Sequence, residues 1–185
     1  MVDTMGASSG SSAERSRMMT GMFRDRESAE RAFGSLTSRG YSKDDVNLIM
    51  SDETRKKHFA DEGGRDSDLG DKVLEDAGKG AAIGGGIGAT IAAIAAIGTT
   101  IALPGLGLLI AGPIAAGLMG AGAGGLTGGL IGALVGYGIP EERAKEYEKG
   151  VSEGGIVMGF NPRSDEDADY FENDWRNNRG EHIYR

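Results

Sequence analysis

His58 lies near Asp61 and Glu62, and these residue types are able to hold a metal ion. Two lysines directly before His58 favour a plainer interpretation, the exposed face of a charged helix. The acidic run at 165–169 is typical of a helix N-terminus, and it lacks the glycine and the distal glutamate of a calcium loop. We therefore predict no metal site.

Motifs for catalysis and cofactor binding are equally weak. Residues 84–89 read Gly-Gly-Gly-Ile-Gly-Ala and contain the glycine spacing of a dinucleotide-binding turn. That turn follows a strand, whereas this motif follows the polar sequence EDAGKG, in a tract where glycines recur by chance. The sequence offers no Ser-His-acid or paired-carboxylate arrangement. We predict no catalytic residues, no cofactor, no small-molecule substrate and no enzymatic activity.

Charge and cysteine content exclude two further classes. The formal net charge is −8, whereas a nucleic-acid-binding protein presents a basic face. The 185 residues include no cysteine, which excludes disulfides and thiolate metal sites. The chain must therefore hold its fold together without these crosslinks.

The centre of the chain carries no charge. Residues 80–140 include no Asp, Glu, Lys, Arg or His and consist mainly of Gly, Ala, Ile and Leu. A Pro-Gly pair at 104–105 divides this stretch into two apolar segments, 80–102 and 113–136. As a helix, each segment extends roughly 35 Å, which matches the hydrocarbon core of a bilayer, about 30 Å thick.

Both apolar segments carry regular stripes. Glycine ridges at a spacing of four let helix backbones approach closely, so we predict that they pack helices and mediate oligomerisation. The ridge residues are Gly80, Gly84, Gly88, Gly120, Gly124, Gly128, Gly132 and Gly136. A separate apolar stripe consists of Ile83, Ile87, Ile91, Ile94, Ile97 and Ile101.

The outer parts of the chain repeat one pattern of strand, amphipathic helix and strand. In the first half, an apolar run at 18–23 precedes a helix that Asp25 caps and Gly40 ends, and a second apolar run follows. In the second half, strands at 155–160 and 181–184 flank a helix with apolar residues at helical spacing. This pattern predicts an α+β fold, a split ferredoxin-like βαββαβ sandwich interrupted between strands 2 and 3 by a Gly/Ala/Ile-rich helical hairpin.

The predicted organisation has six parts. They are a disordered tail (1–16), a first βαβ half (17–50), a charged linker with short helices (51–79), an apolar glycine-zipper helical hairpin (80–138), a solvated helix (139–153) and a second βαβ half (154–185). Strands 2 and 3 are neighbours in this fold, so an insertion between them leaves and returns at nearly the same place.

Three environments satisfy a charge-free hairpin: a bilayer, the core of a homo-oligomer, or the protein's own domain. Two spans return the chain to the side that it left, which suits halves that must pair into one sheet. We expect a structural protein that self-associates and is anchored in or remodels the cytoplasmic membrane, with both termini cytosolic. Its partners would be further copies of itself and the lipid bilayer, not nucleic acid. The alternative is a soluble cytoplasmic particle or filament whose hairpins fill the oligomer core, and a ligand-binding sensory module is a third hypothesis.

Several stretches together resemble a known family. The sequence MFRDRESAERAFGSLTSRGYSKDDVNLIMS opens the first half, the glycine-rich centre follows, and GIPEERAKEYEKGVSEGGIVMGF comes after it. They resemble the bacterial general stress protein 17M-like family, which includes heat-induced and low-temperature-induced proteins. The signature residues are Gly138, Ile139, Pro140, Glu141, Glu142, Ala144, Tyr147, Glu148, Gly150, Gly154 and Gly155. The resemblance implies a bacterial stress-associated protein with a βαβ-type domain and a membrane-like insert, and it implies no catalytic residues.

Overall fold

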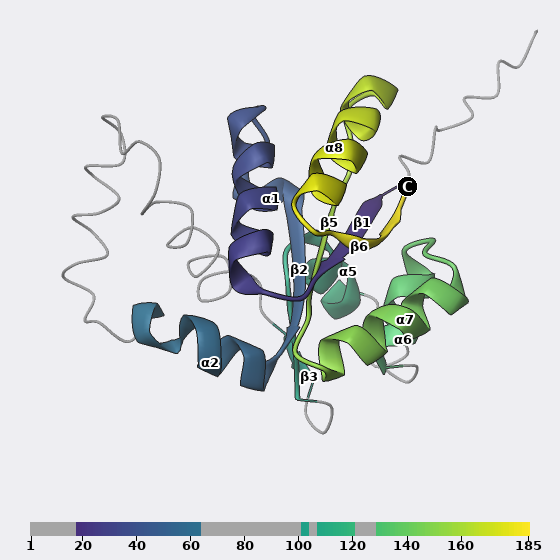
Figure 1. The fold of residues 1–185 in the computed structure, drawn as a ribbon. Helices are drawn as coiled ribbons and strands as arrows, with labels where there is room; N and C mark the ends of the chain where they lie inside the picture. The colour runs from purple at the N-terminus through teal and green to yellow at the C-terminus, as the bar shows by residue number, and fades with distance from the viewer. Residues whose placement is uncertain (1–17, 64–100, 104–106, 121–128) are drawn as a thin grey trace, which may run out of the picture.

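The computed structural model describes residues 18–63, 101–103, 107–120 and 129–185, which build a mixed α+β fold (Figure 1). The predicted α+β class is confirmed. The strands are β1 (Met19–Phe23), β2 (Val46–Ser51), β3 (Ile101–Leu103), β4 (Leu108–Ala111), β5 (Ile156–Phe160) and β6 (Glu181–Tyr184). The helices are α1 (Arg26–Ser38), α2 (Asp52–Gly63), α5 (Pro113–Gly120), α6 (Gly129–Gly136), α7 (Glu141–Ser152) and α8 (Asp165–Asn177).

The strands form one antiparallel sheet in the order β3-β4-β2-β5-β1-β6. β5 lies between β1 and β2, since its Phe160 is level with Met19 on one side and with Val46 on the other. Strands from the two halves of the chain therefore alternate in the sheet. The segment between the halves adds β4 and β3 beyond β2.

α1 and α8 lie side by side over one face of the sheet (Figure 1). A side chain caps the start of each helix, because the Asp25 carboxylate accepts the Ser28 amide and the Ser164 hydroxyl accepts the Asp167 amide. The caps satisfy amides that have no partner within the helix. Helix α1 therefore begins after the capping residue that the sequence predicts, Asp25.

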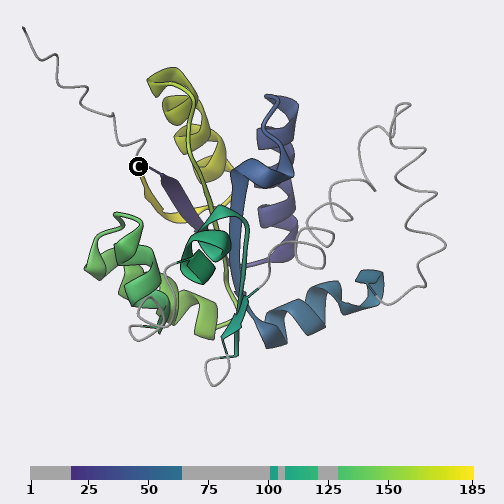
Figure 2. The same ribbon diagram turned by 180° about the vertical axis from the view of Figure 1, so that it is seen from behind.

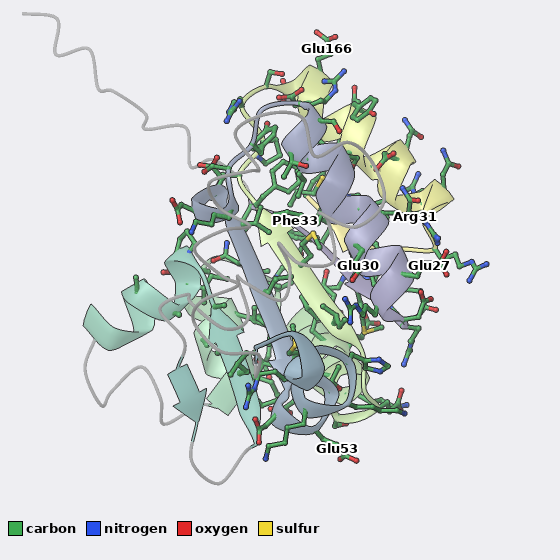
Figure 3. The ribbon with its side chains drawn as sticks, turned by 90° about the vertical axis from the view of Figure 1, so that its left-hand side faces the viewer. Glu27, Glu30, Arg31, Phe33, Glu53 and Glu166 are labelled. Carbon is green, nitrogen blue, oxygen red and sulfur yellow. The ribbon has the colours of Figure 1, made fainter. Side chains whose placement is uncertain are left out.

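Aromatic residues fill the space between this helical layer and the sheet. The Trp175 ring lies edge-on to Phe23, with ring centres 5.5 Å apart, and 5.4 Å from the Phe160 ring centre. Phe33 points toward the sheet, whereas Arg31 lies on the outer side of α1 (Figure 3). One face of the helix is thus buried and the other is charged, as the spacing of its apolar residues predicts.

α5, α6 and α7 cover the opposite face, as the view from behind shows (Figure 2). Ile114 of α5, Leu130 and Leu134 of α6 and Tyr147 of α7 are at most 1% exposed and pack in one cluster with Ile110 of β4. The sheet therefore has a hydrophobic core on each side. Residues of the charge-free centre supply much of the second core.

The predicted helical hairpin is wrong for part of the charge-free centre, because residues 101–103 and 108–111 are strands. β4 pairs with β2 from Leu48↔Ala111 to Ser51↔Leu108, so the unpaired edge of β2 draws this apolar run into the sheet. The predicted second span contains two separate helices, α5 and α6, of eight residues each. Most of the predicted first span, residues 80–100, lies outside the described residues.

The membrane expectation is corrected. In the described ranges, no helix has both the length and the apolar character that crossing a membrane requires. An eight-residue helix such as α5 or α6 extends about 12 Å, well short of a hydrocarbon core about 30 Å thick. Their apolar residues instead pack on the sheet, which overturns the predicted membrane anchor and membrane location for this part of the chain.

Candidate functional site

A buried asparagine fastens the charge-free centre to the sheet. The Asn47 side-chain oxygen accepts a hydrogen bond from the Ile114 amide over 2.7 Å, and its nitrogen donates to the Gly159 carbonyl over 3.4 Å. Asn47 is 3% exposed, so these bonds form away from water, where an unpaired polar group is costly. The sequence analysis did not single out Asn47; the signal was one polar residue within the apolar run VNLIM.

A glycine makes the turn between β4 and α5 next to this asparagine. Gly112 has φ +99°, which side chains rarely adopt, and an added Cβ would lie 2.3 Å from the Val46 carbonyl oxygen. The close approach lets α5 begin directly over β2. Gly112 and Asn47 together therefore place α5, and with it the helical layer that also contains α6.

One side of α6 has no cover among the described residues. Leu130 and Leu134 face the core, but a Cβ added at Gly132 or Gly136 would find no described atom within 4 Å. Val135 is 42% exposed and Tyr137, just after the helix, is 39% exposed. We call Gly132, Val135, Gly136 and Tyr137 the α6 outer face. It is apolar, small in the middle and uncharged.

The predicted glycine-ridge and isoleucine-stripe residues lie in different parts of the structure, and most lie outside the described residues. Gly132 and Gly136 lie together on the α6 outer face, and Gly120 ends α5. Ile101, the last residue of the predicted helical stripe, lies in strand β3. The other predicted residues lie outside the described ranges; they are Gly80, Gly84, Gly88, Gly124, Gly128, Ile83, Ile87, Ile91, Ile94 and Ile97.

The signature around α7 packs this helix against β1. The Tyr147 hydroxyl donates to the His182 carbonyl over 2.5 Å and lies 2.9 Å from the Thr20 hydroxyl, which donates to it in turn. Burial raises the pKa of Tyr147 to about 12. A Cβ at Gly150 would lie 1.9 Å from the Met22 sulfur. These signature residues are explained by packing.

The candidate metal ligands do not converge. Among the described residues, no group of three or more His, Cys, Asp and Glu side chains is placed to hold a metal ion. The His58 carbonyl accepts a hydrogen bond from Arg26, while the side chains of Asp61 and Glu62 lie outside the described set. Of the acidic run, Asp167 pairs with Arg39 over 2.5 Å and accepts the Tyr41 hydroxyl over 2.7 Å.

Acid is expected to weaken the fold through Asp167. The Tyr41 hydroxyl, with help from Arg39, lowers the pKa of this carboxyl below its usual range. Because the pKa is lower in the folded state than in the unfolded state, the ionised carboxylate stabilises the fold above about pH 4. This stabilisation is lost as the pH falls through the folded-state pKa. We predict that Asp167→Asn makes the free energy of unfolding less dependent on pH below about pH 4, by about 1 kcal/mol or less. Urea titrations at several pH values measure this, with exposed Asp165→Asn as the control; an equal effect of both variants would contradict it.

No protein-family model, curated protein or solved structure matches this chain. The resemblance to the general stress protein 17M-like family therefore stays a prediction. A function for the chain is inferred below from its own residues.

Proposed function

We propose that the protein is a non-enzymatic homo-oligomer in which the α6 outer face packs against the same face of a second copy. The observation that carries this proposal is the pair of open glycines, Gly132 and Gly136, beside the exposed Val135. Glycine in a solvent-exposed helix costs about 1 kcal/mol relative to alanine. Close approach of a second backbone over the two glycines offsets that cost, because a side chain at either position would hold the helices apart.

A second copy suits the α6 outer face better than a charged partner does. The face carries no charge, and its tyrosine hydroxyl already donates to the Pro113 carbonyl over 3.0 Å. The same small apolar surface on two chains is self-complementary about a twofold axis, the commonest symmetry of homo-oligomers. Apolar residues and tyrosine are also what the buried centre of such interfaces contains.

We also propose that the outer halves form the split ferredoxin-like sandwich. The order β2-β5-β1-β6, with α1 and α8 on one face, supports this topology, and β3 and β4 are then additions from the insert. The resemblance described above supports a further proposal, that the chain belongs to the stress-associated 17M-like family. In that case the role of the signature residues around α7 is to pack this helix against β1.

Val135→Glu is expected to break the contact at the α6 outer face while leaving the fold intact. An unpaired carboxylate in the contact costs about 3 kcal/mol, or roughly 100-fold in Kd. We predict that size-exclusion chromatography with light scattering finds oligomers for the unmodified chain and a smaller species, which lacks the α6 contact, for the variant.

The matched control is Tyr170→Glu, which places the same charge on a residue 40% exposed on α8, in the other helical layer. This control should assemble as the unmodified chain does. Loss of assembly in both variants, or in neither, would remove the α6 outer face from the proposal.

A further inference from the structure

β6 is attached to the sheet by an irregular ladder. Thr20 of β1 is level with Tyr184 and Met22 is level with Glu181, so the register shifts by one residue between these two pairs. In the described part of the chain, β6 pairs with β1 alone and forms one edge of the sheet. Its residues are exposed or half-buried, and Ile183 packs against the core. This strand is therefore less buried than β1, β2 or β5.

Ion pairs at the surface hold both ends of β6. Glu181 accepts the Arg24 guanidinium over 2.9 Å, and Arg185, just after the strand, pairs with Asp169 and with Glu172 of α8. The paired side chains of Arg24 and Glu181 are 44% and 45% exposed. Exposed ion pairs contribute little to stability and weaken as salt rises.

In the middle of the strand, the His182 imidazole lies 2.9 Å from a Glu146 carboxylate oxygen and 3.3 Å from the Arg143 guanidinium. The hydroxyl of Tyr147, a fully buried residue, donates to the His182 carbonyl. Because Tyr147 binds a backbone carbonyl, any chain that presents the same strand satisfies it equally well.

The link between α8 and β6 is short and strained. It consists of residues 178–180, and Arg179 has φ +62°. Among the described residues, Arg179 and His182 are the two non-glycine residues with positive φ; Arg179 lies in the link and His182 in β6. A Cβ at Gly180 would lie 2.7 Å from the Trp175 carbonyl oxygen, so the link is also tightly packed. Short strained links favour the exchange of the element that follows them.

We propose that β6 exchanges between two copies, so that residues 181–184 of one chain pair with the outer edge of β1 in the other. Charge favours β6 of a second copy as the strand that binds this edge. Basic Arg24 lies at one end of the edge, where it matches Glu181. Acidic Asp169 and Glu172 lie at the other end, where they match Arg185. Exchange keeps every contact of β6 and releases the left-handed conformation of Arg179. The inference rests on the proposed self-association and names a second contact for it.

With two separate twofold contacts, at the α6 outer face and at β6, each chain would join two neighbours. Repeated contacts of this kind give a particle or filament instead of a closed dimer.

Two substitutions at Arg179 change the backbone strain of the link in opposite directions, and the fraction of exchanged dimer should follow. Arg179→Gly accepts positive φ without strain and should reduce the exchanged dimer about tenfold at a given concentration, whereas Arg179→Val, which disfavours positive φ, should increase it. Both variants remove the same charge, so each is the electrostatic control for the other. Equal dimer fractions in the two variants would overturn the proposal.

Exchange is measured by cross-linking, since the chain contains no cysteine. Arg24→Cys and Glu181→Cys chains are mixed in about 1 M salt, which screens the ion pairs, returned to low salt and treated with a short bismaleimide. Exchange predicts a covalent dimer of one Arg24→Cys and one Glu181→Cys chain, and it predicts the same dimer when both chains also carry Val135→Glu. The double variant Arg24→Cys/Glu181→Cys, linked within one chain, proves that the cross-linker fits.

No mixed dimer, with efficient linking in the double variant, would overturn exchange. Light scattering on the same samples separates this result from failure of the proposed function. Oligomers without a mixed dimer leave the α6 contact standing, whereas single copies at every concentration overturn both proposals.

Discussion

Gly112→Ala should lower the free energy of unfolding by about 3 kcal/mol or more and detach α5 from the sheet. Two costs combine at this position: a backbone φ of +99° and a Cβ 2.3 Å from the Val46 carbonyl oxygen. The obstacle is the backbone of β2, which pairs with β4 on one side and β5 on the other and cannot retreat without breaking a ladder. Urea denaturation followed by circular dichroism measures the loss.

Gly107→Ala is the matched control for this substitution. Gly107 also has positive φ, at +58°, but no described atom lies within 4 Å of its Cβ position. The control therefore carries the conformational cost alone, about 1 kcal/mol. An equal decrease in the free energy of unfolding for Gly107→Ala and Gly112→Ala would contradict the close packing of α5 against β2.

Gly150→Leu is expected to destabilise the fold by about 3 kcal/mol, because four carbon atoms enter a space that cannot hold one. A Cβ at this position would lie 1.9 Å from the Met22 sulfur, and Met22 is fully buried in β1. The Gly150 carbonyl in turn accepts the Gly155 amide over 2.8 Å, so a shift of α7 away from Met22 would strain this hydrogen bond. Thermal and urea denaturation should show the same loss.

The same change at Gly132 provides the control. Gly132→Leu adds the same side chain to a helix at a position with open space, so the single copy should keep its stability or gain up to about 1 kcal/mol. Its self-association should weaken, since the added side chain separates the packed helices. Similar destabilisation by Gly150→Leu and Gly132→Leu would mean that α6 is covered in the folded chain.

The outer helices were predictable because their signals are local. Asp25 and Ser164 cap α1 and α8, and apolar residues recur at helical spacing in both. Strand β4 was not predictable, because it is buried on both faces. Leu109 and Ala111 belong to one core and Leu108 and Ile110 to the other, which leaves no alternation of polar and apolar residues. Such a run cannot be distinguished from a buried helix by its periodicity.

The candidate site was predictable only in part, for a similar reason. The spacing of Gly132 and Gly136 identifies a ridge, but whether the ridge faces its own chain or a neighbour depends on what covers α6. Asn47 acquires its role from Ile114, which is far away in the sequence. The positive φ of Arg179 likewise follows from the tertiary fold, since nothing in the residue type requires it.

Self-association is the central claim, and sedimentation velocity on the full-length chain over a hundredfold range of concentration tests it most directly. We predict that the weight-average sedimentation coefficient rises with concentration for the unmodified chain and rises less for Val135→Glu, which can form no more than the dimer with exchanged β6. A single species of 19.2 kDa at every concentration of the unmodified chain would contradict the account.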